Sequence, residues 1–263
     1  MNKRNKNNAD FQNRFGVLGV NISVTNMKNT IQTIQSWIEN SEKKYICVTS
    51  VHGVMESQRD PVIKDIHNNS GLTAPDGMPL VWLGRLYGFS EMGRVYGPDL
   101  MLEVCKNFSL TEYKHFLYGG NTGIAEELRD CLIKRFPGIN IVGTYTPPFR
   151  ALNSNEEKHL IDQVVKLKPD FFWVGLSTPK QEKFMAEYLP KLDVKIMIGV
   201  GAAFDIHTAR IKDAPNWMKN SGLQWLYRLY QEPQRLWRRY LYNNTLFIYK
   251  IILQFLRGFL RGK

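Results

Sequence analysis

The sequence predicts an α/β protein with a largely parallel sheet, flanking helices and a basic helical appendage at its carboxyl end. Short apolar runs alternate with helical patterns through most of the 263 residues, the order expected when helices connect parallel strands. Polar or glycine-rich segments directly follow several of these runs, and basic residues gather near the carboxyl end. Together these observations indicate a Rossmann-like domain with an attached basic segment.

The first predicted strands lie in the amino-terminal half of the chain. Tyr45–Thr49 is a β-branched apolar run, and a helical pattern over 53–67 follows it. Lys114–Tyr118 is a second such run, and after a glycine-rich turn it continues into a helix over Ile124–Phe136 that stops at a Pro-Gly pair. This repeated order of strand, turn and helix is typical of a parallel sheet.

The second half continues the same pattern. Ile139–Tyr145 predicts a strand, and a Ser-x-x-Glu capping spacing that begins at Ser154 opens a helix through Lys166. Phe171–Leu176 and Lys195–Val200 are continuous apolar runs. Such runs are expected for strands that are buried on both faces of a sheet.

The net charge of +11 is distributed unevenly. Residues 206–263 contain eleven basic and two acidic side chains, residues 1–15 carry a net +3, and residues 16–205 carry a net −1. A near-neutral body with a strongly basic end predicts an anionic partner for that end, either a nucleic acid or a lipid surface.

The charge pattern divides the chain into three parts. Residues 1–15 predict a flexible polar terminus without the apolar core of a secretory signal, residues 16–205 the α/β domain, and residues 206–263 the appendage. No apolar run is long enough to span a bilayer. The three cysteines form no CxxC pair, which favours a reducing compartment; they are Cys47, Cys105 and Cys131. We therefore expect a cytoplasmic protein that is peripheral to the membrane.

The carboxyl-terminal segment has the pattern of an interfacial helix. Aromatic residues alternate with arginines over 224–242, where Arg235, Arg238 and Arg239 share one helical face beyond Arg228. The last segment is apolar except for one stripe, formed by Lys250, Gln254, Arg257 and Arg261. This pattern predicts contact with an anionic membrane surface. Packing on the body of the protein or an oligomer contact are the alternatives.

Polar clusters follow the predicted strands at positions where α/β sheets bind ligands. They are Thr49-Ser50, the Gly119-Gly120-Asn121-Thr122-Gly123 turn, residues 177–182 and residues 199–201. Each could be an ordinary turn, but four at equivalent places favour a ligand site. The glycine turn has neither the dinucleotide nor the Walker A spacing, which gives a nucleotide-dependent oxidoreductase little support.

Two further segments contain candidate chemical groups. Asp76 lies in Pro-Asp-Gly-Met-Pro, where rigid neighbours could hold a general base, although an Asp-Gly turn is the simpler interpretation. Arg94 precedes Tyr-Gly-Pro-Asp and is either a clamp for phosphate or a surface side chain. The five histidines lack metal-binding spacing, and there is no Asp-x-Asp or Gly-x-Ser-x-Gly motif. We therefore expect no catalytic metal and no cofactor.

These segments, taken in order, resemble the WecG/TagA/CpsF family of bacterial glycosyltransferases (glycosyltransferase family 26). The resemblance covers roughly residues 16–245. It rests on TAPDGMPLVWLGRLYG (73–88), RVYGPDL (94–100), FLYGGNTGIAEE (116–127), FPGINIVGTYTPPF (136–149), VGLSTPKQE (174–182), GVGAAFD (199–205) and GLQWLYRLYQEPQRLWRRYL (222–241).

The resemblance implies an inverting, metal-independent transfer of a sugar from a UDP-sugar to a polyprenyl-diphosphate-linked saccharide at the inner membrane face. Surface polysaccharides such as wall teichoic acid or exopolysaccharide are the products. The family implies that Asp76 is the base, that Thr49 lies beside it, and that Arg94 contacts the diphosphate or the acceptor. Its pattern places Gln181, Gly119, Gly120, Asn121 and Gly201 around the nucleotide sugar. The arginines of the appendage would dock on the membrane and close over the site.

One departure from the family pattern concerns the donor. The usual Thr-x-Asn is Thr49-Ser50-Val51-His52 here, as in exopolysaccharide-type members. N-acetylmannosamine, its uronate and a plain hexose all remain candidate donor sugars. His52 could lie near the sugar, or it could be a buried histidine at the start of a helix.

Two other classes of function compete with this interpretation. A nucleic-acid-binding α/β protein without catalytic activity would also carry a basic, aromatic-rich end, although the apolar residues of 246–260 argue against it. A nucleotide-dependent oxidoreductase is the third possibility. Assembly into a homo-oligomer is left open by the sequence.

Overall fold

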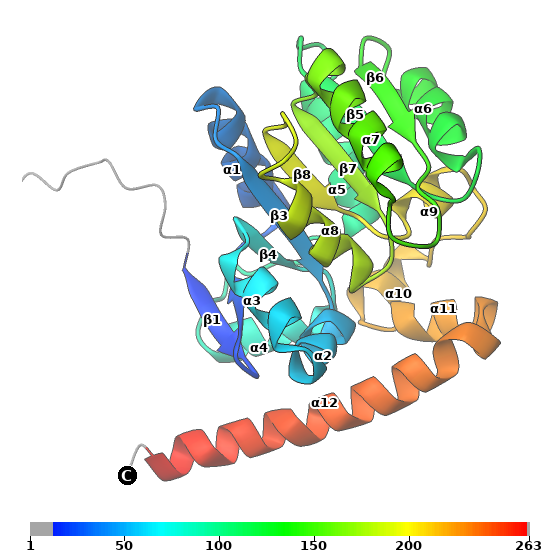
Figure 1. Cartoon of the computed structure of the whole chain (residues 1–263). Coiled ribbons are helices and arrows are strands. Elements are labelled where there is room, and N and C mark those ends of the chain that lie inside the picture. Colours follow the sequence, from blue (N-terminus) through cyan, green and yellow to red (C-terminus); the bar gives the residue numbers. More distant parts are fainter. Residues whose placement is uncertain (1–12, 262–263) are drawn as a thin grey trace, which may run out of the picture.

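A computed structural model describes residues 13–261 of the chain (Figure 1). Its centre is a six-stranded sheet with the order β4-β3-β8-β7-β5-β6, in which every pairing is parallel. The predicted α/β class with a parallel sheet is therefore confirmed. The strands are β3 (Lys44–Thr49), β4 (Leu72–Pro75), β5 (Lys114–Gly119), β6 (Asn140–Tyr145), β7 (Phe171–Gly175) and β8 (Ile196–Gly199).

Helices cover both faces of this sheet. Those of the main domain are α1 (Met27–Glu39), α2 (Val51–Arg59), α3 (Pro61–Asn69), α4 (Met78–Leu86), α5 (Gly97–Phe108), α6 (Ile124–Arg135), α7 (Ser154–Leu167), α8 (Lys180–Tyr188) and α9 (Ala203–His207). A separate antiparallel hairpin, β1 (Arg14–Val17) and β2 (Val20–Ser23), lies beyond the β4 edge of the sheet.

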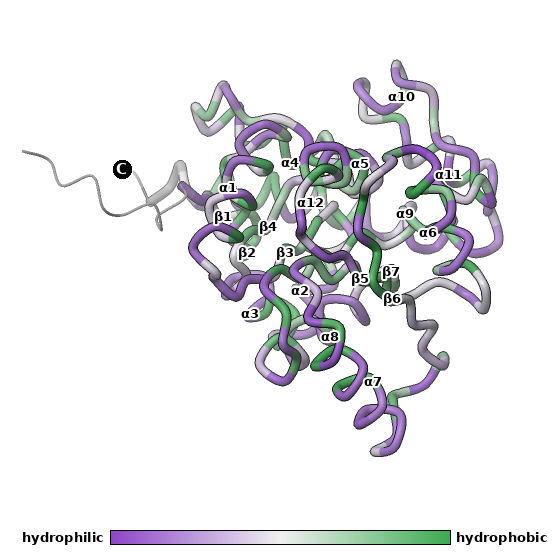
Figure 2. Tube along the Cα trace, turned by 90° about the horizontal axis from the view of Figure 1, so that it is seen from above, coloured by the Kyte–Doolittle hydropathy of each residue, from purple (hydrophilic) through white to green (hydrophobic). Residues whose placement is uncertain are grey.

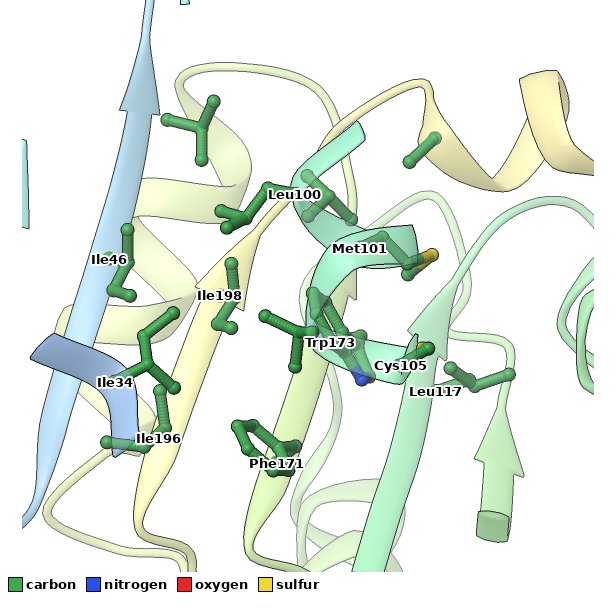
Figure 3. Packing of buried hydrophobic residues seen from close by; sticks show 14 of the residues in the cluster. Ile34, Ile46, Leu100, Met101, Cys105, Leu117, Phe171, Trp173, Ile196 and Ile198 are labelled. Carbon is green, nitrogen blue, oxygen red and sulfur yellow. The ribbon is translucent and has the colours of Figure 1, made fainter. Parts of the chain in front are cut away.

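The core consists of two layers because successive strand residues point to opposite faces. On β7, Phe171 and Trp173 pack against α1, α5 and α6, as Figure 3 shows for the cluster around Trp173. Phe172 and Val174 pack against α7 and α8 on the other face. Viewed from above, hydrophobic residues concentrate along the inner strands (Figure 2). This explains why the strands appear as continuous apolar runs.

The predicted helix over 53–67 is wrong in one respect, because it is two helices. Pro61 has no N–H and ends the first helix before it, and α2 stops at Arg59. Asp60 then caps α3 by accepting a hydrogen bond from the Val62 N–H at 2.9 Å. The N-cap residue of α7 is also shifted by one position from the prediction, since Asn153 rather than Ser154 forms the capping box with Glu156.

Three helices form a cap over one end of the sheet: α10 (Asn216–Asn220), α11 (Gln224–Gln231) and α12 (Pro233–Arg261). The helix α12 runs beside the lower side of the domain (Figure 1) and packs on α2. Its Phe247 and Ile251 are buried in a hydrophobic cluster with residues of the hairpin and of α4. No helix of the described residues is both long and apolar enough to cross a membrane.

The predicted polar stripe of α12 does not form one solvent-facing surface. Gln254 faces the domain, where its amide accepts a hydrogen bond from the Leu18 N–H at 2.8 Å and donates one to the Gly16 carbonyl at 3.1 Å. The opposite side exposes apolar residues instead, among them Leu241, Ile248 and Leu256. Helix α12 is therefore bound to the body on one side and apolar on its free side.

The predicted flexible terminus at residues 1–15 and the end of α12 are described only in part. Residues 1–12 of the predicted flexible terminus lie outside the described residues, while Arg14 and Phe15 already belong to β1. The side chain of Arg261 also lies outside the description.

Candidate active site

A cavity of about 790 Å³ opens at the carboxyl ends of β3, β4, β7 and β8, beneath the helices of the cap. This is the edge at which α/β sheets bind their ligands. The amino ends of α2, α4 and α5 also face it, through Val51, Met78 and Gly97. None of these three helices has a side-chain N-cap, so their first N–H groups are available to an anion.

Asp76 lies in the wall of this cavity, directly after β4. Its N–H donates to the Thr49 carbonyl at 2.8 Å, which continues the pairing between β3 and β4. Arg94 donates to the Asp76 carbonyl, and its Nη2 lies 3.4 Å from Asp76 Oδ1. Burial raises the pKa of the Asp76 carboxyl above its ordinary value, although Arg94 opposes this effect. The result is a carboxylate with increased basicity.

Arg94 is largely buried, so the surface-arginine interpretation is wrong. Its guanidinium donates to the Lys219 carbonyl at 3.3 Å and to the side chain of Gln224, both in the cap. The ring of Tyr96 lies 4.3 Å from its central carbon. These contacts fix the guanidinium beside Asp76 before any ligand arrives.

A second group of polar side chains joins the cap to the domain next to Arg94. Asp213 accepts hydrogen bonds from the Tyr96 hydroxyl at 2.9 Å and from Lys219 Nζ at 3.0 Å. The Lys219 ammonium also lies 3.8 Å from Asp99. This network therefore connects α5 to the start of the cap.

Gln181 and Gly201 lie together on the β7–β8 side of the cavity. Gln181 Oε1 accepts a hydrogen bond from the Gly201 N–H at 3.0 Å, and its Nε2 donates to Glu182 at 3.2 Å. The amide is thus held by neighbours on both sides. It supports the loop after β8, which forms the cavity wall.

His52 lies in the first turn of α2 and also lines the cavity. The Asn243 amide of α12 donates to its Nδ1 at 3.0 Å. Burial, together with the nearby Arg239 charge, lowers the pKa of His52 to about 3. The imidazole is consequently neutral at pH 7, and it can exchange hydrogen bonds with a ligand without adding charge.

Three arginines of the cap line the cavity: Arg228, Arg235 and Arg239. Arg228 and Arg235 share the carboxylate of Glu232, at 2.8 and 2.6 Å. Arg239 has no hydrogen-bond or ion-pair partner among residues 13–261, and its Nε is fully buried. Burial lowers the pKa of this guanidinium from its ordinary value. A partly buried cation with an unpaired buried N–H is less well solvated than one in water, so this position is suited to an anionic ligand.

Arg238 is separated from the other three arginines. It lies on the outer side of α12, where its guanidinium stacks over Trp237 at 5.1 Å, and it does not line the cavity. The expectation that Arg235, Arg238 and Arg239 share one face is therefore wrong. A step of one residue turns a side chain by about 100° around a helix, and that turn separates Arg238 from Arg239.

Two groups of predicted site residues do not reach the cavity. The Thr49 hydroxyl is buried and donates to the Cys47 carbonyl at 3.2 Å. Gly119 ends β5, one strand beyond the cavity wall, and Gly120 and Asn121 follow it. Gly119 has φ of +137°, and a Cβ there would approach the Gly175 carbonyl oxygen to 2.5 Å. The need for this glycine thus comes from packing between strands.

Other cavity residues were absent from the sequence-based prediction. Asn243 and Gln224 occupy the cap, and their long-range partners give no local signal. Trp82 and Leu86 repeat at helical spacing on α4 and look like ordinary core positions, but both are exposed. No group of three His, Cys, Asp or Glu side chains within residues 13–261 could hold a metal ion. Metal independence nevertheless stays a prediction.

The fold and this cavity define an α/β protein with a site suited to an anionic ligand at the carboxyl edge of a parallel sheet, under a helical cap. The chain belongs to the glycosyl transferase WecG/TagA/CpsF family, which it matches over residues 15–260. It is therefore a glycosyltransferase.

Characterised relatives resemble the chain over most of its length. It is 28% identical over 229 residues to a protein of Bacillus subtilis, a match that covers 83% of this chain and 86% of the relative. It is 25% identical over 222 residues to one of Bacillus spizizenii (84% and 83% covered). A Staphylococcus aureus protein is 23% identical over 237 residues (89% and 91% covered). All three are named N-acetylglucosaminyldiphosphoundecaprenol N-acetyl-beta-D-mannosaminyltransferase.

Proposed function

We propose that this enzyme transfers N-acetylmannosamine from a UDP-sugar to a saccharide carried on a polyprenyl diphosphate. The observation that carries this proposal is the combination, in one cavity, of the Asp76 carboxylate and several arginine guanidiniums, those of Arg94, Arg228 and Arg235 among them. A glycosyl transfer needs both a proton acceptor and positive charge for the departing diphosphate. The names of the relatives support the acceptor class and the donor sugar.

In the proposed reaction, Asp76 accepts the proton of the attacking acceptor hydroxyl. The hydroxyl oxygen forms a bond to the anomeric carbon from the face opposite UDP, while the bond between that carbon and the UDP oxygen breaks. The configuration at the anomeric carbon is thereby inverted. UDP leaves with the bonding electron pair, and its diphosphate therefore carries an additional negative charge. The raised pKa of Asp76 increases its strength as a base.

Protein cations would stabilise the departing UDP without a metal ion. Arg235 and Arg228 line the cavity from the cap, and Arg94 lines it from the domain. The free N–H groups at the starts of α2 and α4 add partial positive charge. Because these arginines line the cavity, the alternative of nucleic-acid binding gains no support from their placement.

We also propose that the enzyme is peripheral on the inner face of the cell membrane. The free side of α12 exposes Leu241, Ile248 and Leu256, of which Ile248 also lines the cavity, and Arg257 is exposed on the same helix. An apolar face with nearby basic residues is suited to an anionic bilayer surface. This placement would bring the cavity to the level of a lipid-linked acceptor.

The test is a donor screen against N-acetylglucosamine-diphosphoundecaprenol, with UDP release and lipid-linked product measured together. UDP-N-acetylmannosamine should give equimolar UDP and product, while its uronate and UDP-glucose should react more slowly. Absence of both UDP release and lipid-linked product with all of these donors would overturn the proposed function, and so would UDP release without lipid-linked product. Nuclear magnetic resonance of the product determines whether the linkage is inverted.

A further inference from the structure

The cavity that contains Asp76 has an apolar arm that the proposed sugar transfer does not use. This apolar arm lies between α4 and α12 and is continuous with the polar part of the cavity. Its lining residues are Trp82, Leu83 and Leu86 on α4, and Phe247, Ile248 and Ile252 on α12. The indole N–H of Trp82 is the single polar side-chain group among these six residues.

The arm has a fixed floor. Phe247 is buried against the hydrophobic cluster beneath it, which includes Leu80. Beside the arm, the ring of Tyr87, which directly follows α4, stacks on Phe255 of α12 with the ring centres 5.6 Å apart. The walls therefore belong to two helices that are connected by this contact.

The rim of the arm is unusually exposed for apolar side chains. Leu86 is 70% exposed and Ile252 is 52% exposed. Both lie beside the free apolar side of α12, where Ile248 and Leu256 are also exposed. An apolar chain could thus leave the arm and enter a bilayer along a continuous apolar surface.

The polar and apolar ends of the cavity follow one another along α12. Arg239 lies thirteen residues before Ile252, which corresponds to about 20 Å along a helix. A ligand that fills both ends must therefore be elongated, with an anionic group at one end and an apolar chain at the other. A nucleotide base does not fit the apolar arm, because that arm offers almost no hydrogen-bonding groups.

We propose that the apolar arm binds the first part of the isoprenoid chain of the acceptor, while the acceptor diphosphate lies at Arg239. This inference rests on the proposed function and specifies how its lipid substrate is held. The arm would orient the acceptor saccharide toward Asp76, because the diphosphate joins the chain to the sugar. Recognition would then depend on the length of the chain as well as on the diphosphate.

The test is calorimetric binding of two diphosphates to the full chain, in the absence of vesicles and of any donor. Geranylgeranyl diphosphate, below its micelle concentration, can fill the arm, whereas isopentenyl diphosphate reaches little beyond the polar end. The wild-type protein should bind the longer compound at least about tenfold more tightly. Equal affinities would overturn the proposal.

Substitutions at the exposed rim locate the chain without disturbing the core. Ile252→Asn and Leu86→Gln should each weaken geranylgeranyl diphosphate binding about fivefold and leave isopentenyl diphosphate binding unchanged. Matched controls are Ile133→Asn and Leu110→Gln, which alter exposed residues far from the cavity. Loss of binding in the controls as well, or none in the rim variants, would contradict the assignment.

The contributions of the diphosphate and of the isoprenoid chain to binding can also be measured separately. Arg239→Gln should weaken both diphosphates by the same factor, since it removes a contact to the group they share. A loss confined to geranylgeranyl diphosphate would place the diphosphate elsewhere and overturn the proposal. Because no sugar is transferred in these measurements, a preference for the longer chain can be found even where the donor screen fails. Conversely, sugar transfer without a preference for the longer chain would contradict the assignment of the apolar arm and leave the proposed function standing.

Discussion

The two walls of the cavity differ in how their charges are balanced. On the domain wall, Arg94 is bonded to Asp76 and Gln224 and stacks near Tyr96, so its position is fixed without a ligand. On the cap wall, Arg239 is partly buried and has no hydrogen-bond or ion-pair partner among residues 13–261. The domain wall is thus preorganised, whereas the cap wall would be completed by an anion.

This difference indicates a division of roles. A paired carboxylate with a raised pKa can accept a proton at a defined position. A partly buried guanidinium without a hydrogen-bonding partner has lost part of its hydration, and a diphosphate would compensate for that loss on binding. Four substitutions or conditions can break or sharpen this comparison.

Asp76→Asn should cause the largest loss. A general base contributes about 10²- to 10⁴-fold to the rate, so transfer measured by UDP release should fall by that order. The fold should remain intact, since the backbone bonds of Asp76 to Thr49 and Arg94 do not involve the carboxylate. The matched control is Asp162→Asn, which alters an exposed residue of α7. Unchanged activity in Asp76→Asn would remove the catalytic assignment.

Arg239→Gln should separate activity from stability. We expect kcat/KM to fall about 10- to 100-fold, in line with the loss of a charge-assisted contact to a buried anion. The thermal midpoint should stay the same or rise, because an unpartnered buried charge is removed. Arg238→Gln is the control on the neighbouring, outward-facing position and should match the wild type in a vesicle-free assay. A fall in the midpoint of Arg239→Gln would indicate an internal partner.

Asn243→Ala should have a smaller effect, which concerns the contact between α12 and the domain. Asn243 is buried, donates to His52 and accepts from Arg59. Loss of these bonds should destabilise the fold by about 1–3 kcal/mol and increase hydrogen exchange in α12. Thr245→Ala alters an exposed residue of the same helix and is the control. Equal exchange in both variants would show that Asn243 does not join the cap to the domain.

The pH dependence should show the smallest effect. Asp76 must be ionised to accept a proton, so kcat/KM should fall as pH decreases through its raised pKa. The charged groups that set this pKa are Arg94 and Arg239, which lower it, and Asp99, which raises it. Arg94→Gln should therefore move the acidic limb to higher pH. An unshifted limb in that variant would mean that another group controls it.

The fold class was predictable because parallel strands carry a strong local signal. Runs such as Phe171–Gly175 are apolar on both faces and need no knowledge of their partners. The strand Leu72–Pro75 was missed as a strand because it is short and ends in proline. The break at Pro61 was missed because apolar spacing continues across it.

The site was only partly predictable, for reasons of distance along the chain. Asp76, Arg94, Gln181 and His52 carry local motifs, and the structure brings them to one cavity. Asn243 meets His52 across 191 residues, a pairing that no local pattern reveals. Thr49 was misjudged because strand geometry, and not residue type, decides that its hydroxyl points inward.

Titration with inorganic diphosphate tests the central comparison most directly, since it needs neither the donor nor the acceptor. The wild type, Arg238→Gln and Asp76→Asn should all bind diphosphate, the last at least as tightly because it lacks a negative charge. Arg239→Gln should bind at least about tenfold more weakly, as expected for a lost charge-assisted contact. Wild-type affinity in Arg239→Gln would contradict the account, because the cap would then not supply the charge that the cavity lacks.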